Sequence, residues 1–329
     1  MIDFGADINT NFGYHRFGWN WVVDQSAKEL HCADSSLRLY TFLDCDLLFK
    51  GFNSKLYSVP LPHKDWIGII HLPPNVPYWF SYSHQIKRLK NEELLIKFFE
   101  NCKGIICLSS YLKDYLEEFF QHKIPIHYLP HPVQDFNCKY DIQKIKYAIK
   151  NDFKMLNLVQ MGYWLRRLEY IHRLAEDGFH ESYNLIQLGL NNRKQYLTLL
   201  KTLKISNTPL SNKVFISKKL SQSSFDSLLT NSLPLIPLYD TSANNSLVEC
   251  IGSRTPCLIQ KHPATIEYLG EDYPLYFDNY DELISILKSP DLCDMLEVGN
   301  NRMCHIMSDG KLNIESFISR LKYIIAGIY

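Results

Sequence analysis

The chain repeats one pattern: a short apolar run, a turn, and then an amphipathic helix. GIICLSS at 104–110 precedes the helical pattern YLKDYLEEFF, and MLNLVQMG at 155–162 precedes YWLRRLEYIHRLAEDG. Short apolar runs that end at turn residues are typical of buried strands. Strands that alternate with helices favour a parallel sheet covered by helices on both faces. The sequence therefore predicts a doubly wound α/β protein.

Length and a break in the pattern predict two such domains. At 329 residues the chain is longer than the roughly 250–300 residues at which a single core usually stops growing. The strand–helix alternation begins again after residues 129–136, which contain Pro130 and Pro132. We predict an N-terminal domain at 1–134 and a C-terminal domain at 135–311. A final helix within 312–329 is expected to pack back on the first domain.

The composition excludes several classes of protein. The 35 basic and 35 acidic residues cancel, so no basic excess favours nucleic acid as a partner. The nine cysteines are scattered without C-x-x-C spacing, which is typical of reduced thiols in a cytosolic protein. No basic region with an apolar run opens the sequence, and no apolar run reaches the roughly 20 residues of a membrane span. We expect a cytoplasmic protein.

Residues 238–256, LYDTSANNSLVECIGSRTP, are the most informative stretch of the second half. A buried strand is predicted to end at Tyr239, followed by a polar loop and then a helix that carries Glu249. The N–H groups and positive dipole at the start of such a helix favour an anion. Glu249 would then accept hydrogen bonds from ribose hydroxyls, which makes nucleotide binding the first hypothesis. The structural alternative is a capping box, because Ser246 and Glu249 fit S-x-x-E.

Two other strand ends carry candidate ligands. The strand at 155–162 ends at Gly162, and the helix predicted to follow it bears Arg166 and Arg167 near its start. A glycine turn followed by arginines is suited to a phosphate group. In the first half, the strand at 67–70 ends at His71, which would point into the crevice where α/β folds bind ligands. A buried core histidine is the alternative for His71.

Two weaker signals lie in the first 50 residues. Gly13, His15 and Arg16 follow a short predicted strand and precede a helix that starts near Trp19, so they could approach a phosphate or a sugar. The sequence Asp44-Cys45-Asp46 matches the D-x-D metal motif of one class of glycosyltransferases. Because it lies inside an apolar run, we interpret it as a chance match and expect no metal.

Together these segments resemble the GT-B glycosyltransferases, and in particular the large group 1 type of bacterial enzymes. The resemblance covers most of the chain. Its strongest parts are GIICLSSYLKDYLEEF followed by IPIHYLPHPV, then LVQMGYWLRR, and finally SANNSLVECIGSRTPCLIQKHPATIEYLG. It implies two Rossmann-like domains that face a central cleft. It also implies transfer of a sugar from a nucleotide-diphosphate donor to a hydroxyl acceptor.

The resemblance also assigns roles to individual residues. His71 is the catalytic candidate, Glu249 the ribose ligand, and Gly13, His15 and Arg16 a loop near the donor or acceptor. The implied ligands of the donor diphosphate are Gly162, Arg166, Arg167, Asn244, Asn245 and Ser246. The implied base-binding loop is Lys218, Lys219, Leu220 and Ser221.

One departure from the family pattern leaves the stereochemistry of transfer open. Many retaining members carry E-x7-E, but the position eight residues before Glu249 is Thr241, and Asp240 is one residue out of register. If the enzyme inverts, His71 is the expected base, and if it retains, His71 orients the sugar.

We expect a role in bacterial surface glycan synthesis: polysaccharide, lipopolysaccharide or glycoprotein. The expected acceptor is a glycan, a lipid-linked glycan or a protein. YWFSYSHQIKRLK at 78–90 is either a membrane-contacting segment on the inner face of the membrane or an ordinary surface loop. The alternative functions are a non-catalytic nucleotide-sugar or glycan-binding module and a nucleotide-sugar 2-epimerase.

Overall fold

The computed structural model divides the chain into two compact units. It describes residues 1–5, 18–44, 62–77, 86, 97–151, 156–189, 193–202, 210–217 and 220–328. The first unit comprises Met1–Pro132, Asp240–Asn245 and Lys311–Tyr329, and the second comprises Val133–Tyr239 and Ser246–Gly310. The polar loop and the helix that follows it therefore belong to different units, although they adjoin in sequence.

The first unit contains a parallel four-stranded sheet in the order β1-β2-β3-β4. Its strands are β1 (Leu37–Tyr40), β2 (Asp65–Ile70), β3 (Cys102–Cys107) and β4 (Ile126–Tyr128). Its helices are α1 (Trp19–Leu30), α4 (Ser110–Phe119) and α13 (Ile314–Ala326). Ile2 and Asp3 form only isolated bridges, to His31 and to Arg38 of β1 respectively, so the short strand predicted there is not a full strand.

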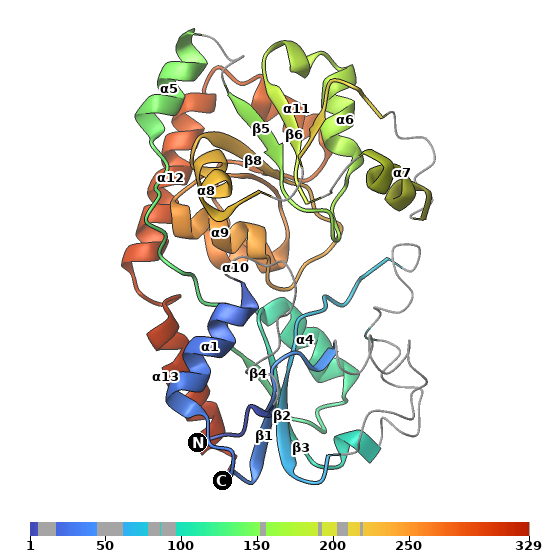
Figure 1. The fold of residues 1–329 in the computed structure, drawn as a ribbon, viewed down its shortest axis with the longest axis vertical. Helices are drawn as coiled ribbons and strands as arrows, with labels where there is room; N and C mark the ends of the chain where they lie inside the picture. The colour runs from blue at the N-terminus through green and yellow to red at the C-terminus, as the bar shows by residue number, and fades with distance from the viewer. Residues whose placement is uncertain are drawn as a thin grey trace. The chain divides into compact units, whose positions relative to one another are not determined.

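Side chains of the β2 strand alternate between two hydrophobic cores, as the twofold period of a strand requires. Ile67 and Ile69 pack in one core with residues of α1 and α13. Trp66 and Ile70 pack in the other core, which includes Leu112 of α4. Figure 1 shows α1 and α13 side by side. The sheet is thus covered on both faces, and the C-terminal helix forms part of the first unit.

The second unit contains a parallel six-stranded sheet in the order β10-β9-β8-β5-β6-β7. Its strands are β5 (Asn157–Gln160), β6 (Asn184–Gln187), β7 (Phe215–Ile216), β8 (Ser232–Ile236), β9 (Leu258–Gln260) and β10 (Tyr276–Phe277). Its helices are α5 (Ile142–Asn151), α6 (Glu169–Glu176), α7 (Arg193–Thr202), α8 (Gln222–Thr230), α9 (Asn245–Ser253), α10 (Pro263–Leu269), α11 (Tyr280–Leu287) and α12 (Leu292–Ser308). A short 3₁₀ helix spans Phe179–Glu181.

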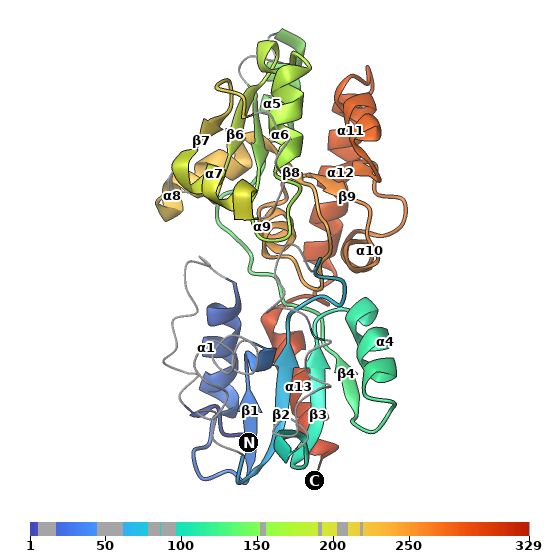
Figure 2. The same cartoon turned by 90° about the vertical axis from the view of Figure 1, so that its right-hand side faces the viewer.

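The order of the six strands places a topological switch point between β5 and β8. The chain proceeds from β5 outward to β6 and β7, and then returns to the other side of β5 to form β8, β9 and β10. Figure 2 shows α7 beside β6 and β7, and α11 and α12 on the side of β9. Crossover connections that leave in opposite directions open a crevice at the carboxyl ends of the two central strands. The predicted α/β class with two parallel sheets is confirmed.

Two predicted element boundaries are wrong, and one helix was not predicted. The strand before the polar loop ends at Ile236 rather than Tyr239. The helix after Gly162 begins at Glu169, so both arginines precede it. No helix was predicted at Leu292–Ser308, where the structure has α12.

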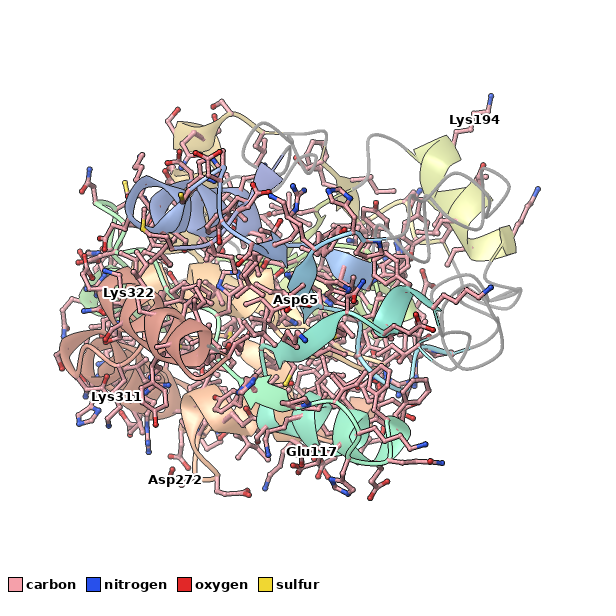
Figure 3. All side chains as sticks on the ribbon, turned by 90° about the horizontal axis from the view of Figure 1, so that it is seen from below. Asp65, Glu117, Lys194, Asp272, Lys311 and Lys322 are labelled. Carbon is pink, nitrogen blue, oxygen red and sulfur yellow. The ribbon has the colours of Figure 1, made fainter. Side chains whose placement is uncertain are left out.

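The surface and the thiols agree with the composition. Charged side chains of both signs lie at the exterior, among them Lys194, Asp272 and Lys322 (Figure 3). Each cysteine within the described ranges is a free thiol. Among the described residues, no helix combines the length and apolar character needed to cross a bilayer.

Candidate functional site

The loop between β5 and α6 lies at the switch point and is held by backbone bonds. The N–H of Tyr239 donates to the carbonyl of Leu165 at 3.0 Å. Arg166 and Leu238 form an antiparallel bridge beside this bond. Because these contacts join the segments that follow the two central strands, the loop is fixed at the carboxyl edge of the sheet.

Positive backbone φ angles shape this loop. Gly162 has φ 76° and Leu165 has φ 52°, a region that L side chains occupy at a cost of about 1–2 kcal/mol. Gly189, at the end of β6, approaches the loop closely: a Cβ on Gly189 would lie 3.1 Å from the Cα of Gly162. A strained loop held by its neighbours is common at functional sites.

Arg166 brings a buried positive charge into the loop. Its Nε donates to the Met161 carbonyl at 3.2 Å, and its Nη1 donates to the Trp164 carbonyl at 2.9 Å. Its Nη2 lies 3.5 Å from the hydroxyl of Ser246, in the first turn of α9. Burial lowers the pKa of Arg166 to about 10, because the charged form loses hydration. The guanidinium still remains charged at neutral pH. Because burial removes water from this charge, a bound anion would stabilise it.

Gly162 lies within van der Waals reach of this charge. A Cβ built on Gly162 would have its nearest neighbours at 3.9 Å, which are the Nε of Arg166 and the hydroxyl of Ser246. Gly162, Arg166 and Ser246, predicted as diphosphate ligands from separate parts of the sequence, therefore lie together in the second unit. The positive end of the α9 dipole adds to the positive potential there.

Arg167 points to a different environment. Its Nε donates to the Leu238 carbonyl at 3.2 Å, and its guanidinium lies 4.5 Å from the ring centre of Tyr239. The phenol of Tyr239 is hydrogen-bonded to Glu169. Burial, the largest effect, raises the pKa of the Glu169 carboxyl. The two adjacent arginines thus contact different neighbours. The sequence alone could not show which arginine faces which neighbour.

The predicted capping box is out of register with α9. The helix begins at Asn245, so Ser246 is its second residue rather than its cap, and Glu249 lies in the second turn. Asn244 precedes the helix and is buried. Glu249 is half-buried. The capping alternative for Glu249 is therefore wrong, whereas its ribose role remains a prediction.

The other end of α9 is clamped by the segment that opens the second unit. Phe136 donates its N–H to the Gly252 carbonyl at 3.2 Å, and Tyr140 donates to Ser253 at 2.9 Å. A Cβ on Gly252 would lie 2.3 Å from the carbonyl oxygen of Gln134. Only glycine permits this approach, so the C-terminal end of α9 packs directly against the backbone at Gln134.

In the first unit, His71 lies at the end of β2, as predicted, and is enclosed by aromatic rings. Its ring centre is 4.6 Å from that of Trp19 and 4.3 Å from that of Phe42. Its Nδ1 lies 3.5 Å from a carboxylate oxygen of Asp44. That distance is within ion-pair range but is longer than a typical hydrogen bond. The surroundings of the His71 ring therefore include a carboxylate as well as aromatic rings.

Asp240 anchors the polar loop to the first unit. Its carboxylate accepts the backbone N–H of Asn75 at 2.6 Å and that of Thr241 at 2.8 Å. Asn75 also donates to the phenol of Tyr111 at 2.7 Å. Burial and the nearby Asp240 carboxylate raise the pKa of Tyr111 to about 12. The acid closest to the expected E-x7-E position therefore holds backbone groups.

Sequence reasoning missed Asp44 and Asp240 as structural partners. No local pattern joins Asp44 to residue 71 or Asp240 to residue 75, because each pair meets only through the fold. The one available signal was that an acid inside an apolar run needs buried hydrogen-bond donors.

Several predicted site residues cannot be placed or have an evident local role. The described residues do not include Gly13, His15, Arg16, Lys218, Lys219 and most of 78–90. Leu220 is half-buried, and Ser221 caps α8 by accepting the N–H of Ser224 at 3.2 Å. Within the described ranges, no three His, Cys, Asp or Glu side chains cluster as metal ligands.

Comparison with known proteins gives no sequence match but a clear structural one. No family model and no curated protein matches the chain. A UDP-forming α,α-trehalose-phosphate synthase from Burkholderia xenovorans aligns over 96% of this chain and 80% of its own, with 14% identity and a TM-score of 0.58. The chain has the GT-B fold.

Two further structures extend this fold assignment. Sucrose-phosphate synthase from Thermosynechococcus elongatus aligns over 94% of this chain and 77% of its own, with 12% identity and a TM-score of 0.60. A TarM variant from S. aureus, in complex with UDP and α-GlcNAc-glycerol, aligns over 93% of this chain but only 58% of its own, with 14% identity and a TM-score of 0.58. At these identities the likeness establishes the GT-B fold, and function must be argued from the site.

Proposed function

We propose that the protein is a glycosyltransferase that moves a sugar from a nucleotide-diphosphate donor to a hydroxyl acceptor. The observation that carries the proposal is the convergence of Gly162, Arg166 and Ser246 at the switch point of the second sheet. A glycine turn, a buried arginine and the start of a helix together form an anion site. GT-B structures that align with this chain include a synthase described as UDP-forming and a TarM complex with UDP, which makes UDP the first nucleotide to test.

The proposed chemistry requires stabilisation of a leaving group. The nucleoside diphosphate gains negative charge as the bond to the sugar breaks. Arg166 and the N–H groups near Asn244, Asn245 and Ser246 would stabilise that charge through preorganised electrostatics. We expect no metal in this step. Glu249 would bind the ribose, and residues 218–221, which follow β7, would bind the base.

His71 would act on the sugar side of the reaction. If transfer inverts the anomeric centre, the imidazole takes the proton of the acceptor hydroxyl. If transfer retains it, the imidazole accepts a hydrogen bond from a sugar hydroxyl and orients that sugar. The acceptor is proposed to be a glycan of the bacterial surface, with the enzyme in the cytoplasm or on the inner face of the membrane.

A non-catalytic nucleotide-sugar module is the second candidate, and one observation favours it. Thr241 occupies the position of the first acid in E-x7-E, and the neighbouring Asp240 carboxylate already accepts two backbone N–H groups. A module of this kind would bind the donor tightly and release no nucleotide. Turnover therefore separates the two candidates.

Thermal unfolding with UDP, GDP, CMP, ADP and TDP tests the donor site. A nucleotide that binds only the folded chain at 100 times its Kd adds about 2.7 kcal/mol of stability, so one nucleotide should raise Tm above the others. Release of that nucleotide from its sugar conjugate only when an acceptor is present would support transfer. Absence of a shift with all five nucleotides would contradict the proposal.

A further inference from the structure

We propose that Asp44 is a positioning residue that sets the proton arrangement of His71. In this arrangement the Nδ1 of His71 carries the proton and its Nε2 accepts a hydrogen bond from a sugar hydroxyl. The identity of the hydroxyl rests on the proposed glycosyltransferase function. The link between Asp44 and His71 rests on the geometry of the first unit alone.

Both carboxylate oxygens of Asp44 face residues at the end of β2. Its Oδ2 accepts the backbone N–H of His71 at 3.0 Å and that of Leu72 at 2.7 Å. Its Oδ1 faces the Nδ1 of His71 at 3.5 Å. Asp44 is only 2% exposed. This first acid of the D-x-D sequence is therefore directed at the protein rather than at a solvent-accessible metal site.

The aromatic neighbours restrict the movement of the imidazole. Trp19 lies edge to face with the His71 ring at 75°, and the Phe42 ring is tilted by 50°. Trp19 is itself fixed, because its indole N–H donates to the Thr41 carbonyl at 2.7 Å. A ring held between these two partners keeps its Nδ1 edge toward Asp44.

A carboxylate beside one ring nitrogen determines what the other nitrogen can do. It favours the N–H on its own side, so the opposite nitrogen retains a lone pair. We expect the 3.5 Å distance between Nδ1 and Asp44 to shorten when a substrate hydroxyl binds, because catalytic hydrogen bonds are often long before the substrate is in place. Within the described part of the chain, both ring nitrogens of His71 are buried and lack a hydrogen-bond partner, but Nδ1 is the one that lies beside Asp44, which leaves Nε2. It is thus the atom left to accept a hydroxyl, whether that hydroxyl belongs to the acceptor or to the donor sugar.

Asp44→Asn is the discriminating substitution. The Asn side-chain oxygen can still accept the N–H groups of His71 and Leu72, while its NH₂ group faces Nδ1 and donates to it. The variant should therefore fold, but the proton of His71 should move to Nε2. Asp65→Asn is the matched control, because Asp65 lies at the opposite, exposed end of the same strand.

The tautomer is read directly by ¹⁵N NMR of the full chain with labelled histidine, with His71 assigned by comparison with His71→Gln. We expect the Nδ1–H form in the wild type and in Asp65→Asn, and the Nε2–H form in Asp44→Asn. An Nε2–H wild type, or an unchanged tautomer in Asp44→Asn, would overturn the proposal. This readout needs no substrate, so it stands apart from failure of the glycosyltransferase assignment.

Turnover provides the second measurement. Asp44→Asn should lower kcat by on the order of 10²-fold and leave UDP affinity unchanged. Asp44→Asn in a His71→Gln background should cause little further loss, because both changes act on one interaction. Additive losses in the double variant would show that Asp44 acts independently of His71, and would refute the positioning role even if Asp44→Asn were unstable.

Discussion

Arg166→Lys compared with Arg167→Lys tests the donor site most directly, because the two adjacent arginines differ in their surroundings. Lysine keeps the positive charge but loses the forked guanidinium. At position 166 the change removes a donor that faces Gly162 and the hydroxyl of Ser246. A hydrogen bond to a charged group contributes about 1.5–3 kcal/mol, which corresponds to a roughly 10–150-fold weaker Kd for UDP.

At position 167 the same change removes contacts within the protein. The losses are a hydrogen bond to the Leu238 carbonyl and the stacking on Tyr239, the latter worth about 0.5–1 kcal/mol. We expect a lower Tm for Arg167→Lys, and a UDP affinity within about threefold of the wild type, which is less than 1 kcal/mol.

Isothermal titration with UDP well below Tm measures both affinities. Arg166→Lys also leaves buried carbonyls short of donors, so circular dichroism must first show that the variant is folded. A larger loss of UDP affinity in Arg167→Lys than in Arg166→Lys would refute the assignment of Arg166 to the diphosphate.

Three further predictions concern α9 and α6. Glu249→Gln should change the free energy of unfolding by less than about 0.5 kcal/mol but weaken UDP binding by about tenfold; unchanged affinity in titration would exclude a ribose contact. Gly252→Ala should destabilise the protein by about 1–3 kcal/mol, because its Cβ meets a backbone oxygen. Gly178→Ala is the control: Gly178 has φ 88°, but a Cβ there would have open space around it. This change should lower the free energy of unfolding by only about 1 kcal/mol. Equal losses for Gly252→Ala and Gly178→Ala, measured by urea unfolding, would contradict the role of the backbone oxygen. For Glu169, burial raises the folded pKa, so the folded state loses stability as pH rises through it. Glu169→Gln should therefore be more stable than the wild type at about pH 7.5 and similar to it at about pH 4; a constant difference would contradict the burial argument.

Local sequence patterns were sufficient for the α/β class and for most of its elements. Short apolar runs located β2, β3 and β5, and the amphipathic pattern YLKDYLEEFF located α4, which Ser109 caps in the structure. The turn at Gly162 was also predictable, because a positive φ angle at a strand end favours glycine. These features depend on residues that are neighbours in sequence, which is why the sequence alone determined them.

Tertiary structure decided the features that depend on distant partners. Helix α12 was missed because Gly299 and Asn300 are poor helix formers. In the fold, a Cβ on Gly299 would lie 3.0 Å from Pro256, and Asn300 donates to the Arg254 carbonyl at 2.7 Å. Close packing at Gly299 and the long-range hydrogen bond of Asn300 thus outweigh the weak helix propensity of these residues.

Distant partners also determine the arrangement of the candidate site. Arg166 and Arg167 are equivalent by sequence, but the bridge to Leu238 directs them to different neighbours. Asp44 reaches His71 across 27 residues, and Asp240 reaches Asn75 across 165. The sequence by itself determined which residue types stand at the strand ends. Only the parallel crossovers of the two sheets decided which of those side chains meet, because they bring together segments that no local period connects.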